Sequence, residues 1–160
     1  MTVDRFVAIV RLSNGEREKN AGRKKIAMTD DCVFCKIIDG EIPGHVVHET
    51  ENVIAFLDAQ PVSRGHTLVV PKEHVEDIHG TADMDFMWDA IVKVSDAIEE
   101  VFDPEGIQIA QNNGEKAGQE VFHMHFHVTP VYDGTELEVE YNRTDLDEGH
   151  EIAEKLREEV

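Results

Sequence analysis

Cysteine, aromatic residues and long apolar runs are all scarce in this chain of 160 residues. Its two cysteines, Cys32 and Cys35, are too few for the dense disulfide framework of a small secreted domain. No apolar run approaches the roughly 20 residues that cross a bilayer, and the apolar stretch at residues 6–10 is too short for a secretory signal. We therefore expect a cytoplasmic protein without a membrane partner, built around a single core.

Positive charge is also scarce, and it is unevenly distributed. The whole chain has a formal net charge of −19. Residues 1–27 contain seven Lys and Arg against three Asp and Glu, whereas the remaining residues contain eight against 31. We interpret residues 1–27 as a basic N-terminal appendage and residues 28–160 as one domain with a C-terminal helix. The appendage is either an arm that binds a partner or an extension upstream of a start at Met28.

The acidic body limits the class of ligand. Its field repels nucleic-acid backbones and anionic lipid, so we expect no polymeric nucleic acid as a partner. A small nucleotide remains compatible with it. The acidity itself has two interpretations: a solvated surface of the halophilic type, suited to a salt-rich cytosol, or a docking surface for a basic protein.

Apolar spacing and turn residues predict mixed helices and strands without strict alternation, which favours an α+β fold. The strongest helical pattern covers residues 83–102, where apolar side chains recur every three or four positions. Asp31 is expected to cap a short helix through Ile38. The other predicted elements are strands at 45–49, 53–57, 67–70, 107–111 and 121–129, and a last helix at 147–159.

Histidine alternates with apolar residues from Val121 to Val128. As a strand, this segment would place His123, His125 and His127 on one face and its apolar side chains on the other. Three histidines on one face are hard to explain as structural residues, since each would need its own buried partner. One metal ion bound by all three is disfavoured, because the outer Cα atoms would lie roughly 13 Å apart. A neutral imidazole beside a protonated one instead suits phosphoryl or nucleotidyl transfer.

Two further segments suggest chemistry. In the loop at residues 112–119, Gly114 and Gly118 would let backbone N–H groups approach an anion, although such a loop is also an ordinary hairpin turn. The Cys32-x-x-Cys35 spacing suits either a metal site or a redox pair.

The segment Gly118–Val128, Gly-Gln-Glu-Val-Phe-His-Met-His-Phe-His-Val, resembles the signature of the histidine-triad (HIT) family of nucleotide hydrolases and transferases. Residues 32–43 resemble the opening segment of that family, and residues 55–58 and 65–74 resemble its middle. The resemblance covers about residues 30–132 in the family's order. It implies a HIT-like fold with an antiparallel five-stranded sheet, one long helix and one or two shorter ones. It also implies a homodimer whose sheets join across subunits.

The resemblance also implies roles for particular residues. His125 would form a covalent nucleotidyl intermediate, and His127 would contact the phosphate and assist the leaving group. His123, His66 and Gln119 complete the catalytic set. Glu120 stands where some relatives have serine, which leaves the preference for the leaving group open. The implied nucleotide-binding residues are Phe34, Ile37 and Phe56 at the base, Asp58 at the ribose, and Asn112, Gly118 and Gln119 around the phosphate.

A subset of the family binds zinc through two cysteines and two histidines, which here would be Cys32, Cys35, His74 and His123. Four protein ligands leave no open position, so this zinc would be structural. The alternative is a pair of reduced, unligated thiols.

Together these observations predict an enzyme that cleaves at the α-phosphate of a purine nucleoside phosphoramidate, an adenylate or a dinucleoside polyphosphate. Two other functions stay open. The first is a nucleotide-binding regulatory protein without catalysis. The second is a hydrolytic metalloenzyme that uses the three histidines as metal ligands.

Overall fold

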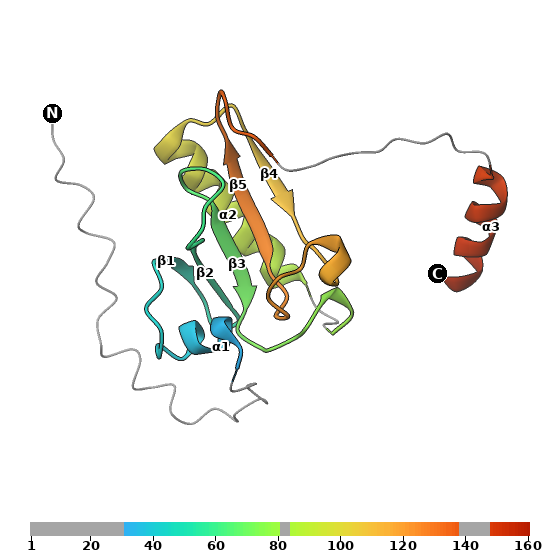
Figure 1. Ribbon diagram of the computed structural model, residues 1–160, viewed down its shortest axis with the longest axis horizontal. Helices are drawn as coiled ribbons and strands as arrows, with labels where there is room; N and C mark the ends of the chain where they lie inside the picture. The colour runs from blue at the N-terminus through green and yellow to red at the C-terminus, as the bar shows by residue number, and fades with distance from the viewer. Residues whose placement is uncertain (1–30, 81–83, 138–147) are drawn as a thin grey trace, which may run out of the picture.

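The computed structural model describes residues 31–80, 84–137 and 148–160 (Figure 1). The predicted appendage at residues 1–27 lies outside this part of the chain. In chain order the elements are α1 (Val33–Ile38), β1 (Val46–Glu49), β2 (Val53–Leu57), β3 (Thr67–Pro71), the 3-10 helix η3 (Ile78–Gly80), α2 (Asp85–Phe102), β4 (Gly106–Ala110), the 3-10 helix η4 (Glu115–Ala117), β5 (Phe126–Val131) and α3 (Gly149–Glu159).

The five strands form one antiparallel sheet in the order β1-β2-β3-β5-β4. His127 of β5 lies opposite Leu68 of β3 on one side and Ala110 of β4 on the other. The predicted α+β architecture, with a five-stranded antiparallel sheet and one long helix, is confirmed. β4 forms one edge of the sheet, and β1 forms the other.

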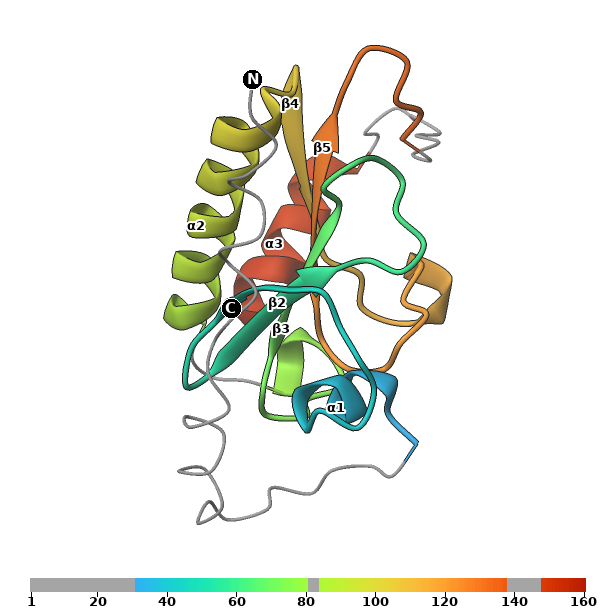
Figure 2. The ribbon, with the colours of Figure 1, turned by 90° about the vertical axis from the view of Figure 1, so that its left-hand side faces the viewer.

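The two faces of the sheet are covered by different helices (Figure 2). Side chains alternate between the faces along a strand, so Val53 and Ala55 of β2 pack toward α2 while Ile54 and Phe56 pack toward α1. The core on the α2 side includes Met87, Ile91 and Ile98, three of the residues whose spacing predicts the helix. The core on the α1 side includes Phe34 and Cys35.

The strand that contains the histidine segment begins later than predicted. β5 begins only at Phe126, so residues 121–125 are not part of the strand expected at 121–129. The Met124 N–H donates to the carbonyl oxygen of Val75, at 2.7 Å, outside the regular ladder between β3 and β5. Phe122, predicted to pack, has a side chain that is 46% exposed. Met124, Phe126 and Val128 do pack in the core on the α2 side, as the alternation predicts.

The N-cap of the first helix also differs from the predicted one. The N-cap of α1 is Cys32 rather than Asp31, and its Sγ accepts a hydrogen bond from the backbone N–H of Cys35. The C-cap of the long helix α2 is Asp103, which adopts a left-handed conformation with φ of 46°. α3 has no buried residue and lies apart from the sheet (Figure 1). No helix in the described residues is long and apolar enough to span a membrane.

Candidate active site

The three histidines divide between two clusters. His123 lies against Cys32, with its Nδ1 3.4 Å from the Cys32 Sγ. The rings of His125 and His127 lie together, with centroids 4.9 Å apart, and His66 adjoins His127 at 5.2 Å. The predicted division of faces is nevertheless confirmed for residues 123–128: His123 and His125 contact Phe34 and His127 lies opposite Leu68 on the α1 side, whereas Met124, Phe126 and Val128 pack on the α2 side. His123 lies with Cys32 and Cys35, whereas His66 is the third histidine of the cluster that contains His125 and His127.

His125 is held in a single tautomer. Its Nδ1 lies 2.7 Å from the carbonyl oxygen of His123, and because a carbonyl only accepts, Nδ1 must carry the proton. The other ring nitrogen, Nε2, then has a free lone pair. Burial lowers the pKa of His125, while its bond to the His123 carbonyl and the charges of Asp58 and Glu120 oppose this shift. Near pH 7 the ring is neutral, which is the nucleophilic form.

His66 fixes the tautomer of His127. The backbone N–H of Val62 donates to the His66 Nδ1 at 3.2 Å, so the proton of His66 is on Nε2. That N–H lies 3.0 Å from the His127 Nδ1, which must accept it. His127 therefore presents an N–H donor at Nε2. Burial, followed by the neighbouring His125 and His66, lowers the pKa of His127 to about 4, against the attraction of Asp58.

Asp58, His66 and His127 also offer three possible metal-ligand atoms within 4.8 Å of one another. The hydrogen bonds argue against a metal at this place. A metal on the His66 Nε2 would require the proton to move to Nδ1, where the Val62 N–H already donates. Asp58 lies 3.7 Å from the His66 Nε2 and acts instead as a nearby negative charge.

Cys32, Cys35, His74 and His123 form a set that fits a tetrahedral metal ion. Their ligand atoms all lie within 4.8 Å of one another. The Cys35 Sγ is 3.3 Å from the His74 Nδ1, and 3.6 Å from the His123 Nδ1. Zinc bond lengths of about 2.3 Å to sulfur and 2.0 Å to nitrogen give tetrahedral edges of roughly 3.5 Å, and these sulfur–nitrogen distances are already close to that value.

The surroundings of these four residues also favour a metal site. The His123 Nε2–H donates to the carbonyl oxygen of Pro71 at 2.9 Å, which leaves the Nδ1 lone pair facing the thiols. Burial lowers the pKa of His123 to about 4, so the ring is neutral and able to ligate. Cys32, Cys35 and His123 are buried, and His74 is half-buried. These four residues could hold a metal ion.

The glycine loop is built differently from the prediction. The backbone N–H groups of Gly118 and Gln119 donate to the carbonyls of Glu115 and Gly114, and the Gly114 N–H donates to the Gln119 Oε1. These three amides are thus engaged within the loop and do not face an anion. The N–H of Glu120, by contrast, has no acceptor among the described residues, which leaves it available to a ligand.

Gln119 and Asn112 organise this loop. The Gln119 side chain is buried, and its Nε2 donates to the carbonyl of Glu76 at 2.6 Å. The Asn112 Nδ2 donates to the carbonyl of Gly118 at 3.2 Å. Gly118 has φ of +91°, a conformation that favours glycine, and a Cβ there would also lie only 3.1 Å from the Asn112 side chain.

The residues implied for the base and ribose border the same site. The Phe34 ring packs edge-on against His125, with centroids 5.1 Å apart, and against Phe56, at 5.5 Å. Ile37 is half-buried on the same helix. Asp58 follows β2, and its Oδ1 accepts the backbone N–H of Gln60. Sequence reasoning missed the carbonyls of Pro71 and His123 and the N–H of Val62, because a backbone group that fixes a tautomer leaves no mark in the sequence.

Comparisons with known proteins agree with this geometry. The HIT domain model matches residues 39–134. Adenosine 5′-monophosphoramidase HNT1 of Candida albicans is 40% identical over 139 residues, covering 81% of this chain and 91% of that protein. A HIT family protein structure from Bacillus anthracis has a TM-score of 0.74 at 39% identity, covering 83% of this chain and 99% of that one. A zinc-bound histidine triad family protein from Mycobacterium smegmatis has a TM-score of 0.58 at 32% identity, covering 81% and 98%. The chain described here belongs to the HIT domain family.

Proposed function

We propose that this protein hydrolyses a purine nucleoside 5′-phosphate derivative at its α-phosphorus, with His125 as the nucleophile. Phosphoramidates, adenylates and dinucleoside polyphosphates are the candidate substrates. The observation that carries the proposal is the tautomer of His125, whose Nδ1–H is bound to the His123 carbonyl so that the Nε2 lone pair is free. The similarity to a yeast adenosine 5′-monophosphoramidase supports the same class of reaction.

In the first step, the His125 Nε2 attacks the α-phosphorus while the bond to the leaving amine or oxygen breaks. The leaving group departs after gaining a proton from solvent. The His127 Nε2–H donates a hydrogen bond to the phosphate, and the Glu120 N–H supplies another donor where negative charge builds up. The phosphorylated ring of His125 is positively charged, and the His123 carbonyl and the carboxylates of Asp58 and Glu120 stabilise it.

In the second step, water attacks the same phosphorus and the bond to the His125 Nε2 breaks. The products are a nucleoside monophosphate and the original neutral imidazole, and the proton lost by water returns to solvent. We assign Phe34, Ile37 and Phe56 to the base, Asp58 to the ribose hydroxyls, and Asn112, Gly118 and Gln119 to the shape of the phosphate loop. A flat purine suits the apolar base site.

We further propose that the metal ion of the cysteine-histidine set is zinc and that it is structural. A metal bound by four protein ligands has no position for substrate or water. Its contribution is to hold α1, the segment after β3 and the start of the histidine segment together. The zinc-bound mycobacterial neighbour supports this identity.

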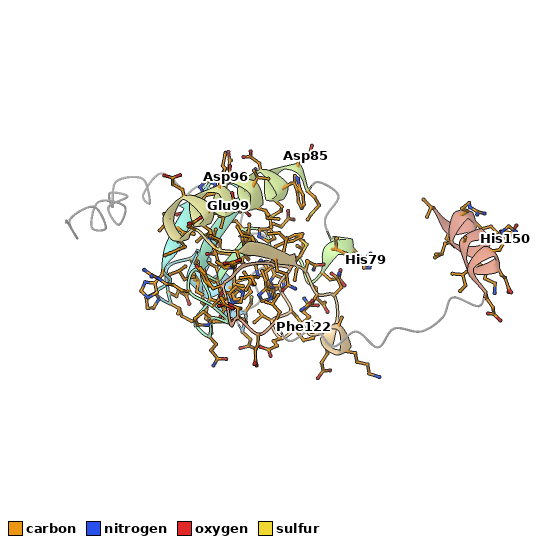
Figure 3. The ribbon with its side chains drawn as sticks, turned by 90° about the horizontal axis from the view of Figure 1, so that it is seen from above. His79, Asp85, Asp96, Glu99, Phe122 and His150 are labelled. Atoms are coloured by element: carbon orange, nitrogen blue, oxygen red, sulfur yellow. The ribbon has the colours of Figure 1, made fainter. Side chains whose placement is uncertain are left out.

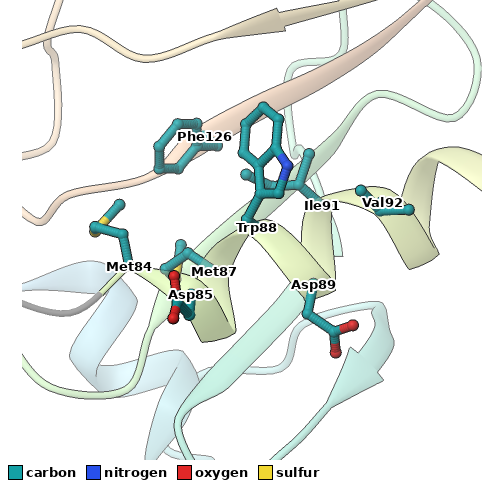
Figure 4. Close-up of a pocket in the computed structure, with 8 residues that line it drawn as sticks. All are labelled: Met84, Asp85, Met87, Trp88, Asp89, Ile91, Val92 and Phe126. Carbon is teal, nitrogen blue, oxygen red and sulfur yellow. The ribbon is translucent and has the colours of Figure 1, made fainter.

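A homodimer is the oligomeric state that we propose. β4 is an edge strand, so one row of its backbone groups is unpaired within the described sheet. Beside it, α2 and β5 line an open, largely apolar pocket of about 570 Å³ (Figure 4). Trp88 is 61% exposed and Val92 is 45% exposed at this place. This surface is suited to a second copy and lies apart from the histidines.

One experiment tests the proposed reaction. Adenosine and guanosine phosphoramidates, an adenylate and a dinucleoside polyphosphate are assayed at several salt concentrations with the wild type and His125→Ala. We expect turnover of at least one class by the wild type and none by the variant, with AMP affinity kept within about an order of magnitude. Near-normal turnover by His125→Ala would contradict the mechanism.

The same experiment separates the other functions. Binding of AMP by the wild type without turnover of any substrate would indicate a regulatory nucleotide-binding protein. Loss of turnover on chelation with the protein still folded would indicate a metalloenzyme, since a structural zinc is lost together with stability.

A further inference from the structure

The two thiols lie where they could react with each other. Cys32 is the N-cap of α1 and Cys35 is in its first turn, and the Cys35 N–H donates to the Cys32 Sγ at 3.4 Å. Both sulfurs lie close to the His123 Nδ1, at 3.4 Å and 3.6 Å. No disulfide joins them in the described structure. These are also the only two cysteines in the sequence, so each has one possible partner within the chain.

The thiols differ in access. Cys32 is 9% exposed and follows the exposed Asp31, whereas Cys35 is 2% exposed and lies deeper, against His74. An oxidant arriving from solvent therefore reaches the Cys32 sulfur first, and Cys35 is placed to act second. A two-cysteine site with one attacking and one resolving thiol has this arrangement.

We propose that Cys32 and Cys35 are a redox-modification site at which a small-molecule disulfide joins them reversibly and expels the metal ion. The Cys32 thiolate attacks one sulfur of the small disulfide, forming a mixed disulfide and releasing one small thiol. The Cys35 thiolate then attacks the Cys32 sulfur, forming the internal disulfide and releasing the second small thiol. The two cysteines lose two electrons, and the small disulfide gains them. The set then lacks both sulfur ligands, and two histidines alone hold zinc weakly.

The modification is transmitted to the active site by two contacts. The His123 ring loses its ligand, while its own carbonyl oxygen is the group that binds the His125 Nδ1–H. Phe34 lies between the cysteines in the sequence, and its ring packs edge-on against both histidines, with centroids 6.0 Å from His123 and 5.1 Å from His125. Disturbing this support should lower kcat by about 10-fold or more. Only this effect on hydrolysis rests on the proposed function; disulfide formation and metal release do not.

The test uses the full chain loaded with zinc and treated with oxidised glutathione in the presence of a metal-sensitive dye. We expect zinc release in proportion to an intact mass that falls by two hydrogen atoms per chain, and a disulfide-linked peptide containing both cysteines. Reduction followed by added zinc should restore the mass, the metal content and kcat. Zinc release and mass are measured without substrate, so they decide the proposal even if no nucleotide is hydrolysed.

Two matched variants assign the roles of the thiols. Cys35→Ser keeps the attacking thiol and should accumulate a glutathione adduct on Cys32. Cys32→Ser keeps only the buried thiol and should remain largely unmodified under the same treatment. Circular dichroism checks that each variant is folded, and the wild-type mass and peptide map decide the outcome if either is not.

The proposal is overturned if the folded wild type releases no zinc and keeps its mass. It is also overturned if both cysteines carry stable glutathione adducts, or if the disulfide links two chains on a non-reducing gel. If the disulfide forms and zinc leaves but an active enzyme keeps its full kcat, the link from the cysteines to His125 is wrong.

Discussion

The Nδ1–H of His125 donates to the carbonyl oxygen of His123 over 2.7 Å, while the ring of His123 faces the thiols of Cys32 and Cys35. One residue thus contributes its side chain to the candidate metal set and its backbone to the candidate active site. We therefore propose that His123 is a positioning residue whose ring does not contact the substrate. We therefore expect the stability of the proposed metal set and the reactivity of His125 to be coupled through this hydrogen bond.

Loss of the His66 donor should impair turnover more than binding. In His66→Phe the His127 Nδ1 loses its partner, so the Nε2–H of His127 is no longer fixed toward the site. We expect kcat to fall by about 10- to 100-fold with KM nearly unchanged, measured by steady-state kinetics. His66→Gln, which keeps an N–H donor, should retain more activity. Equal kcat values for His66→Phe and the wild type would remove His66 from the mechanism.

Metal removal should destabilise the protein rather than only inactivate it. A ligand that binds the native state alone stabilises it by about 4 kcal/mol when its free concentration is 1,000 times Kd. Chelation, or Cys32→Ser, should therefore lower the midpoint of thermal unfolding, and His125→Ala, which keeps all four ligands, should still bind zinc by elemental analysis. A zinc-free purified wild type that has the same midpoint with and without added zinc would contradict this prediction.

The sequence predicts the two faces of the histidine segment better than it predicts where strand β5 begins. Residues 53–57 form a strand as expected, since the pairing of β2 with β3 obeys the period of two that apolar spacing reveals. Residues 121–125 follow the same spacing but leave the ladder, because the His123 ring bonds to the Pro71 carbonyl and the Met124 N–H bonds to the Val75 carbonyl. Those acceptors are backbone groups from a distant segment, which no local pattern reveals.

Acidification should weaken the native state through His127. Its pKa is about 4 in the folded protein, below the ordinary value of 6.5. Between these values the unfolded chain binds more protons than the native one, so this group's stabilisation is complete above about pH 6.5 and is lost as the pH falls toward 4. The difference in the free energy of unfolding between the wild type and His127→Gln, from urea titrations, should shrink over this range. The difference isolates His127 from the carboxylates that titrate nearby, and a constant difference would contradict the assignment.

Salt should stabilise the protein. The outer side of α2 carries Asp85, Asp96 and Glu99 (Figure 3), within a chain of net charge −19. Raising the ionic strength from 0.1 M to 1 M shortens the Debye length from about 10 Å to about 3 Å and so screens their mutual repulsion. The thermal midpoint should rise with KCl over this range, and potassium glutamate is a second salt for comparison. A midpoint independent of salt favours the other interpretation of the acidity, a surface that binds a basic protein.

The proposed dimer interface predicts that a charge at Trp88 disrupts the dimer, whereas a charge at Val47 does not. Trp88 lines the apolar pocket between α2 and β5, so Trp88→Glu places a charge at the surface proposed to be buried against a second copy (Figure 4). Light scattering should give a dimer mass for the wild type and a monomer mass for this variant. Val47→Glu is the matched control, because Val47 is 44% exposed on β1, at the opposite edge of the sheet from β4. It should remain a dimer, and a monomer mass for the wild type itself, at micromolar concentration, would exclude the assembly. Because burying an unpaired charge in an apolar contact costs several kcal/mol, a dimer that tolerates Trp88→Glu must use a different surface.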